Sequence, residues 1–371
     1  MILADVSVVS AETLKEALTS AYRRNPRLDA ERARLRATNE EVPRAVSGYR
    51  PQLSADADVT FENTNTRPDT ESEGELYTKG YTIRGTQPVF SGFRTLNQVR
   101  EAEAVVRAGR ESLRSVEQSV LLEAVTAYVD VVRDQAIVRL RENNVTVLTR
   151  EMKAVEERFK VGEVTRTDVA QAQARRARAV SALDLARANL KTSRATFERV
   201  VGHPPSNVTD PVVPTRLAPK TLQEALGVAE RESPSIVAAL YREQAARHTV
   251  DRIWGELLPE VQIEGSYTHR WNPSRATDES ERTTVVGRVN VPIYQGGEVH
   301  ARVRQAKHTH VQRLQEVEQA RTETQATAVA AWSRLEASRA QLVSDQAQVD
   351  ANRTALTGVR EEEKFGQRTL L

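Results

Sequence analysis

The sequence predicts a mainly α-helical protein with some β-structure, built from a duplicated unit of long coiled-coil helices and two β-hairpins. Three observations predict it: an internal repeat, paired stretches of alternating polarity, and two very long segments without proline. Composition agrees, since 5% of the residues are aromatic and 28% are charged, as in helices that bury little core. The 53 basic and 51 acidic residues nearly balance, so nucleic acid is not an expected partner.

An internal repeat extends over most of the chain. The segment "TLKEALTSAYRRNPRL" from Thr13 returns as "TLQEALGVAERESPSI" from Thr221, and "YRPQLSADADVTF" returns as "LLPEVQIEGSYTH" at the same spacing. Further on, "QPVFSGFRT" is matched by "VPIYQGGE", and "KVGEVTRTDV" by the closing "KFGQRTLL". Because the order is the same in both halves, we expect three parts. They are a first repeat at 1–203, a Pro-rich linker at 204–220 and a second repeat at 221–371.

The two repeats differ in length. A helical pattern at 166–201 follows the first turn motif and has no counterpart after the second, so we expect the chain to be cut at a turn, without its last helix. The beginning, "MILADVSVVSAETL", lacks the basic region and apolar run of a secretory signal, and we expect such a signal to be missing. With no cysteine, the chain fits an oxidising compartment and has no thiolate metal site, catalytic Cys or lipidated Cys.

Each repeat carries one hairpin, predicted at 52–90 and at 259–294. From Leu53 to Phe61 the odd positions are apolar and the even positions polar, so one face of the strand is apolar. This alternation fits a half-buried soluble sheet and a lipid-facing sheet, and both remain open on the pattern alone. No stretch approaches 18 apolar residues, so any membrane crossing would be made by strands.

Two long helices follow the hairpins, at 95–160 and 298–364. The first has no Pro and one Gly, and a continuous α-helix of this length would extend about 99 Å. Apolar residues recur every seven positions from Val99 to Ala127, which keeps one seam against a neighbouring helix. A second stripe begins at Leu121, so the helix is expected to pack on two sides. The alternative is an ordinary long coiled coil, as in a soluble periplasmic adaptor or scaffold protein.

Together these motifs resemble the TolC-type outer-membrane efflux and secretion channel family of Gram-negative bacteria. The resemblance runs from about Thr13 to the last residue and is carried by the two strand-to-helix motifs and the two turn motifs. It implies that three copies form a 12-stranded transmembrane β-barrel in the outer membrane, continuous with a periplasmic α-barrel. The motif "QPVFSGFRT" and the absence of a lipidated Cys favour the type I secretion branch.

The resemblance also implies a function without catalysis. The chain would be the passive, gated outer-membrane component of a tripartite type I secretion or multidrug efflux system. Its partners would be a periplasmic adaptor (membrane fusion protein), an inner-membrane ABC or RND transporter, outer-membrane lipid and two further copies of itself, and it would need no cofactor. His308 and His310 lie two apart on a helix and point to different faces, so no metal site is expected there.

Three sets of residues are expected to carry the function. A gate held by hydrogen bonds and ion pairs is implied at Thr167, Asp168 and Arg368, where the carboxylate of Glu363 would compete for Arg368; alternatively, Asp168 is a helix N-terminal residue favoured by the dipole. The adaptor-docking tip comprises Val161, Gly162, Glu163, Val164, Phe365, Gly366 and Gln367. The lipid-facing side chains are Phe61, Tyr81, Ile83, Tyr267, Val289 and Val291.

Overall fold

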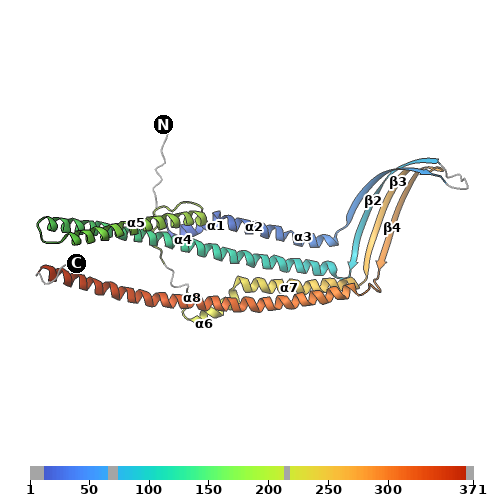
Figure 1. Ribbon diagram of the computed structural model, residues 1–371. Helices are drawn as coiled ribbons and strands as arrows, with labels where there is room; N and C mark the ends of the chain where they lie inside the picture. Colours follow the sequence, from blue (N-terminus) through green and yellow to red (C-terminus); the bar gives the residue numbers. More distant parts are fainter. Residues whose placement is uncertain (1–11, 66–73, 213–217, 365–371) are drawn as a thin grey trace, which may run out of the picture. The chain divides into compact units, whose positions relative to one another are not determined.

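The computed structural model describes residues 12–65, 74–212 and 218–364. Contacts divide the chain into two compact units, one formed by Met1–Arg44 and Gly109–Arg216 and the other by Ala45–Ala108 and Leu217–Leu371. Each unit is built from segments far apart in the sequence. The expectation of a mainly helical protein with some sheet is confirmed (Figure 1).

Helices make up the first unit. The helix α1 begins with a capping box in which Thr13 and Glu16 bond each other's backbone amides, and α2 begins with Asn25 as N-cap and Pro26 in its first turn. The long helix α4 belongs to this unit from Gly109 onward. The helices are α1 (Leu14–Arg24), α2 (Pro26–Asn39), α4 (Arg94–Lys160) and α5 (Arg166–Val201), and a short α3 (Glu41–Val46) follows α2.

The core of the first unit is small and lies where α1, α4 and α5 meet. Its fully buried large side chains are Tyr128 of α4 and Phe197 of α5, packed among alanines and valines. The Tyr128 hydroxyl lies 2.8 Å from the Glu12 carbonyl oxygen and 2.7 Å from that of Thr209. This buried tyrosine therefore connects the segment before α1 to the segment after α5.

The second unit combines a sheet with α6, α7, α8 and the beginning of α4, up to Ala108. The four strands are antiparallel in the order β1-β2-β3-β4, and Figure 1 shows them side by side. The helices α7 and α8 pack together through Ile253, Val299, Val303 and Ala306. The elements are β1 (Gln52–Thr64), β2 (Gly74–Ser91), α6 (Leu222–Glu232), α7 (Pro234–Trp254), β3 (Glu260–Ser274), β4 (Thr277–Asn290) and α8 (Glu298–Lys364), with 3-10 turns at Ser47–Tyr49 and Gly255–Leu257.

The register of the sheet sorts its side chains onto two faces. Ala55 lies opposite Ile83, which lies opposite Tyr267, and this row defines the apolar face. One position along, Asp56 lies opposite Thr82 and Thr82 opposite Thr268, in a row that defines the polar face. Because successive residues of a strand point to opposite sides, the odd positions of β1 are apolar and the even positions polar.

A glycine makes the passage from strand β2 to helix α4 possible. Gly92 has a φ of 62°, and a Cβ atom on it would lie 2.2 Å from the carbonyl oxygen of Gly255. No side chain fits at that distance, and the left-handed backbone itself disfavours other residues. The glycine in "QPVFSGFRT" thus brings the start of α4 against the turn that precedes β3.

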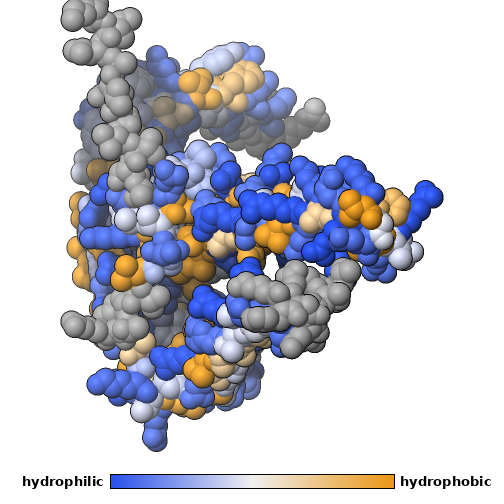
Figure 2. All heavy atoms as spheres, turned by 90° about the vertical axis from the view of Figure 1, so that its left-hand side faces the viewer, coloured by the Kyte–Doolittle hydropathy of each residue, from blue (hydrophilic) through white to orange (hydrophobic). Residues whose placement is uncertain are grey.

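The far half of α8 has little contact with the rest of its unit. From Ser333 to Gly358 every residue is exposed, including Leu342 and Val343. On the surface that faces the viewer in Figure 2, hydrophobic residues are interspersed with hydrophilic ones. Among the described helices, none has a segment apolar and long enough to span a bilayer.

Removing the largest buried side chain of α5 should destabilise the first unit. Phe197 is 0% exposed, so Phe197→Ala is expected to lower the free energy of unfolding by about 3 to 5 kcal/mol. Urea unfolding followed by circular dichroism checks this, with Leu185→Ala, which truncates an exposed side chain of the same helix, as the matched control. Equal losses for both variants would contradict the assignment of the core.

Candidate functional site: the helix tip and the two-faced sheet

The helix α4 ends in a glycine turn. Gly162 has a φ of 81°, its amide donates to the Phe159 carbonyl at 3.0 Å, and the Glu163 amide donates to the Arg158 carbonyl at 3.0 Å. These two bonds are the Schellman motif, which satisfies the last carbonyls of a helix. Apart from the glycine itself and its two chain neighbours, no described residue has an atom within 4 Å of where a Cβ on Gly162 would be, so its surroundings are open.

The helix α5 starts immediately after this turn with a second capping box. The Asp168 carboxylate accepts hydrogen bonds from the Thr165 amide and hydroxyl, both at 2.7 Å, while the Asp168 amide donates to the Thr165 hydroxyl. The bonds from the Thr165 side chain and backbone lower the pKa of Asp168 below its ordinary value. Asp168 therefore caps α5, which is the second of the two roles that the sequence leaves open for it.

The structure brings the first half of the predicted tip and gate together. The segment 161–164 forms the turn, and Thr167 is exposed in the first turn of α5. Glu363 belongs to the last turn of α8. The other predicted tip and gate residues, Phe365, Gly366, Gln367 and Arg368, lie outside the described residues.

Five of the six predicted lipid-facing side chains share the apolar face, and Val291 directly follows β4. Phe61, Ile83 and Val289 are 53%, 47% and 63% exposed. Tyr81 and Tyr267 are half-buried because their rings pack against each other with centroids 6.1 Å apart. The sheet thus presents apolar and aromatic side chains on one side without a covering layer in its own unit.

The same face also carries a charged cluster that the sequence reasoning missed. His269 lies 2.8 Å from a carboxylate oxygen of Glu279 and 3.2 Å from one of Glu281, and its ring stacks on Tyr81 with centroids 5.6 Å apart. The Lys79 ammonium lies 5.5 Å from the ring centroid of Trp271. The odd numbering of these residues was the available signal, since it places them on the apolar face.

Arginine and carboxylate side chains form ion pairs on the polar face. Arg270 reaches across Gly80 toward Asp58, with 3.5 Å between the nearest atoms. A Cβ at position 80 would lie 2.8 Å from the Cγ of Arg270, so glycine leaves the room for this crossing. Arg288 donates two hydrogen bonds to Glu264, at 3.0 and 3.1 Å. This face is suited to contact water and polar solutes.

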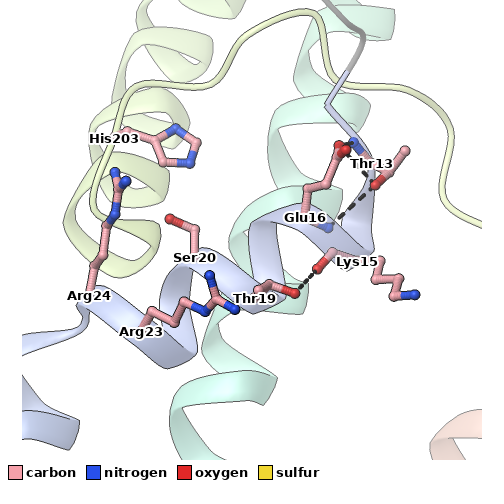
Figure 3. A pocket seen from close by; sticks show the side chains of 8 residues that line it. All are labelled: Thr13, Lys15, Glu16, Thr19, Ser20, Arg23, Arg24 and His203. Carbon is pink, nitrogen blue, oxygen red and sulfur yellow. Dashed lines mark hydrogen bonds between the residues drawn. The ribbon is translucent and has the colours of Figure 1, made fainter.

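A polar pocket of about 640 Å³ lies on the first unit beside α1 (Figure 3). Its cations are Lys15, Arg23 and Arg24. The hydroxyl of Thr19 donates to the Lys15 carbonyl at 2.8 Å, and that of Ser20 donates to the Val201 carbonyl at 3.0 Å. These two hydroxyls donate to backbone carbonyls, and the third hydroxyl of the pocket, that of Thr13, donates to the Glu16 carboxylate at 3.0 Å. The pocket therefore offers charge and hydrogen bonds.

One of the two closely spaced histidines of α8, His310, contacts a carboxylate of another helix. The His310 ring nitrogen Nε2 lies 2.6 Å from a carboxylate oxygen of Glu243 on α7, an interaction between neighbouring helices. Within the described ranges, no three potential ligands are arranged to hold a metal ion.

Comparison with known proteins identifies the family of this chain. The model of the outer membrane efflux protein family matches residues 17–203 and 225–371. The chain is 38% identical over 370 residues to the outer membrane efflux protein BepC of Brucella suis, covering 97% of this chain and 78% of BepC. It is 23% identical to the outer membrane protein TolC of Escherichia coli, over 98% of this chain and 76% of TolC.

The fold agrees with that relationship. A crystal structure of CusC, described in connection with transmembrane channel formation, superposes with a TM-score of 0.83 at 14% identity, covering 97% of this chain and 84% of CusC. The two matched ranges of the family model contain both hairpins and both long helices. The chain belongs to the outer membrane efflux protein family.

Proposed function

We propose that the chain is the channel component of a tripartite type I secretion or multidrug efflux system, a passive gated conduit from the periplasm to the exterior. The observation that carries the proposal is the two-faced sheet. Its apolar face leaves Phe61, Ile83 and Val289 exposed, while its polar face bears ion pairs such as that of Arg288 with Glu264. Family membership agrees with this role.

We also propose a homotrimer with a 12-stranded barrel, as the resemblance to the TolC-type family implies; on strand count alone, two copies with eight strands would close a barrel as well. Four strands are too few to close a barrel, whereas three copies supply twelve and pair every edge. Cyclic symmetry is the ordinary way for identical chains to close such a ring. A soluble adaptor or scaffold is the alternative, and it would leave the exposed apolar face of the sheet unexplained.

The long helices would form the periplasmic part and meet the other components. We infer that the tip at 161–164, with Phe365, Gly366 and Gln367, receives a periplasmic adaptor, which links the channel to an inner-membrane ABC or RND transporter. The open space around Gly162 supports this, because a partner's backbone could approach it closely. The repeat division at 1–203 and 221–371 would then place one turn of each repeat at the tip.

The lipid-facing assignment is tested by a charge on each face of the sheet. Ile83→Lys should destabilise the inserted protein by about 2 to 4 kcal/mol near the bilayer centre, because lipid cannot solvate the ammonium. Asp58→Lys, on the polar face, is the control and should be tolerated better. Unfolding of the protein in lipid vesicles measures both, and equal sensitivity at the two positions would argue for a soluble sheet.

The docking role of the tip is tested at its glycine. Gly162→Leu should leave the oligomer intact but abolish export, because the side chain fills the space above the turn. Gly162→Ala imposes the same left-handed backbone penalty with a much smaller side chain, so it separates strain from bulk. Export assays with the full-length protein decide the matter, and normal export by the Leu variant would refute docking at this turn.

We further propose that Thr167, Asp168, Glu363 and Arg368 contribute to the gate. Arg368→Ser and Asp168→Ala should each raise single-channel conductance, and the double variant should add nothing if the two side chains form one latch. Thr165→Ala is the control, because it weakens the capping box while keeping the carboxylate. If Thr165→Ala raised the conductance as much as Asp168→Ala does, the effect would come from weakening the helix cap, and the latch would be refuted.

A further inference from the structure

Both edge strands of the sheet are long. β1 has 13 residues and β4 has 14, and neither contains a proline or a lysine. Exposed strands with a row of free backbone groups invite pairing with another chain, and natural edges are commonly blocked by such residues. The two edges are therefore open to pairing with further strands.

The polar side chains at these edges carry opposite charge. On the polar face, β1 contributes three acids, Asp56, Asp58 and Glu62, and no base. On the same face, β4 between Ser280 and Asn290 contributes Arg282 and Arg288 and no acid. One edge is thus acidic and the other basic on the side that holds polar groups.

These charges cannot neutralise one another within one copy. The row through Asp56 runs across Thr82 and Thr268 to Arg282, so the two charges lie three strand spacings apart, about 14 Å. Within the described part of the chain, neither Asp56 nor Arg282 makes an ion pair. Arg288 already binds Glu264, but a guanidinium has five donors and can serve a second carboxylate.

We propose that β1 of one copy pairs with β4 of a second copy in the register that sets Glu62 opposite Arg282 and Asp56 opposite Arg288. This inference rests on the proposed function, which supplies the ring of copies. Glu62 and Asp56 are six residues apart, as are Arg288 and Arg282, so one antiparallel register makes both pairs at once.

The apolar face supports the same register. It sets Val59 opposite Val285 and Ala55 opposite Val289, and it pairs residues 54–64 with 280–290. Registers shifted by two residues keep each side chain on the same face of the sheet but lose the pairing of acids with arginines. One shift places no acid directly opposite an arginine, and the other places only Asp58 opposite Arg288, both of which already have partners.

The absence of cysteine in the chain allows a direct test. In the proposed register Thr60 lies opposite Thr284 of the next copy, so Thr60→Cys with Thr284→Cys should give a covalent oligomer when the full-length protein in membranes is oxidised. These two positions lie on opposite edges of one sheet, and a disulfide between them must join two copies. Non-reducing electrophoresis measures the product.

Two control pairs report the shifted registers while leaving every charge in place. They are Gln52→Cys with Asn290→Cys and Thr60→Cys with Val286→Cys, and each should crosslink several-fold less. Stronger crosslinking of either control would overturn the register while leaving the channel proposal standing. Absence of any membrane-inserted oligomer in the unaltered protein would instead overturn the proposed function and the seam together.

Charge reversal tests the ion pair itself. Glu62→Arg and Arg282→Glu should each lower the temperature at which the oligomer dissociates, because like charges would then face each other. The double variant should restore much of the loss, since it recreates an opposite pair. Additive losses in the double variant would overturn the pairing of these two side chains.

Discussion

The backbone hydrogen bonds of the sheet are the constraint on which the proposed assembly depends. Within one copy, β2 and β3 are paired on both sides, whereas β1 and β4 each have one row of amide and carbonyl groups without a strand partner. In a hydrocarbon environment each unsatisfied group would cost several kcal/mol. A sheet with an exposed apolar face and two open edges is consequently stable in lipid only when other strands complete it.

The turn between α4 and α5 differs from the sheet, because its backbone hydrogen bonds need no partner. There the chain satisfies its own backbone groups, through the Schellman bonds of Gly162 and the capping box of Thr165 and Asp168. The turn needs no partner to hold its conformation, so its outward side chains are free for contacts. Val161 is 73% exposed at this point. A self-sufficient turn with an exposed apolar residue is a suitable contact point for another protein.

Sequence periodicity located the main elements but left out contacts between them. Alternation from Leu53 to Phe61 anticipated β1, and the proline-free run anticipated α4 to within one residue at its start. The pattern did not show that His269 would lie between Glu279 and Glu281, since cross-strand neighbours depend on the register of β3 with β4. It also left Asp168 with two roles, because a capping box and a latch use the same carboxylate.

The buried cores are small, so much of the long helices has no packing partner within the described residues. The buried cluster of the first unit is mostly alanine and valine around Tyr128 and Phe197, and that of the second unit has four residues. Helical stability in proteins comes mainly from packing of an apolar face, and α8 leaves residues 333–358 exposed in a single copy. Leu342 and Val343 in that segment gain burial only against further helices. The helical half and the sheet thus have one property in common, since each leaves apolar surface or backbone groups uncovered within the described residues.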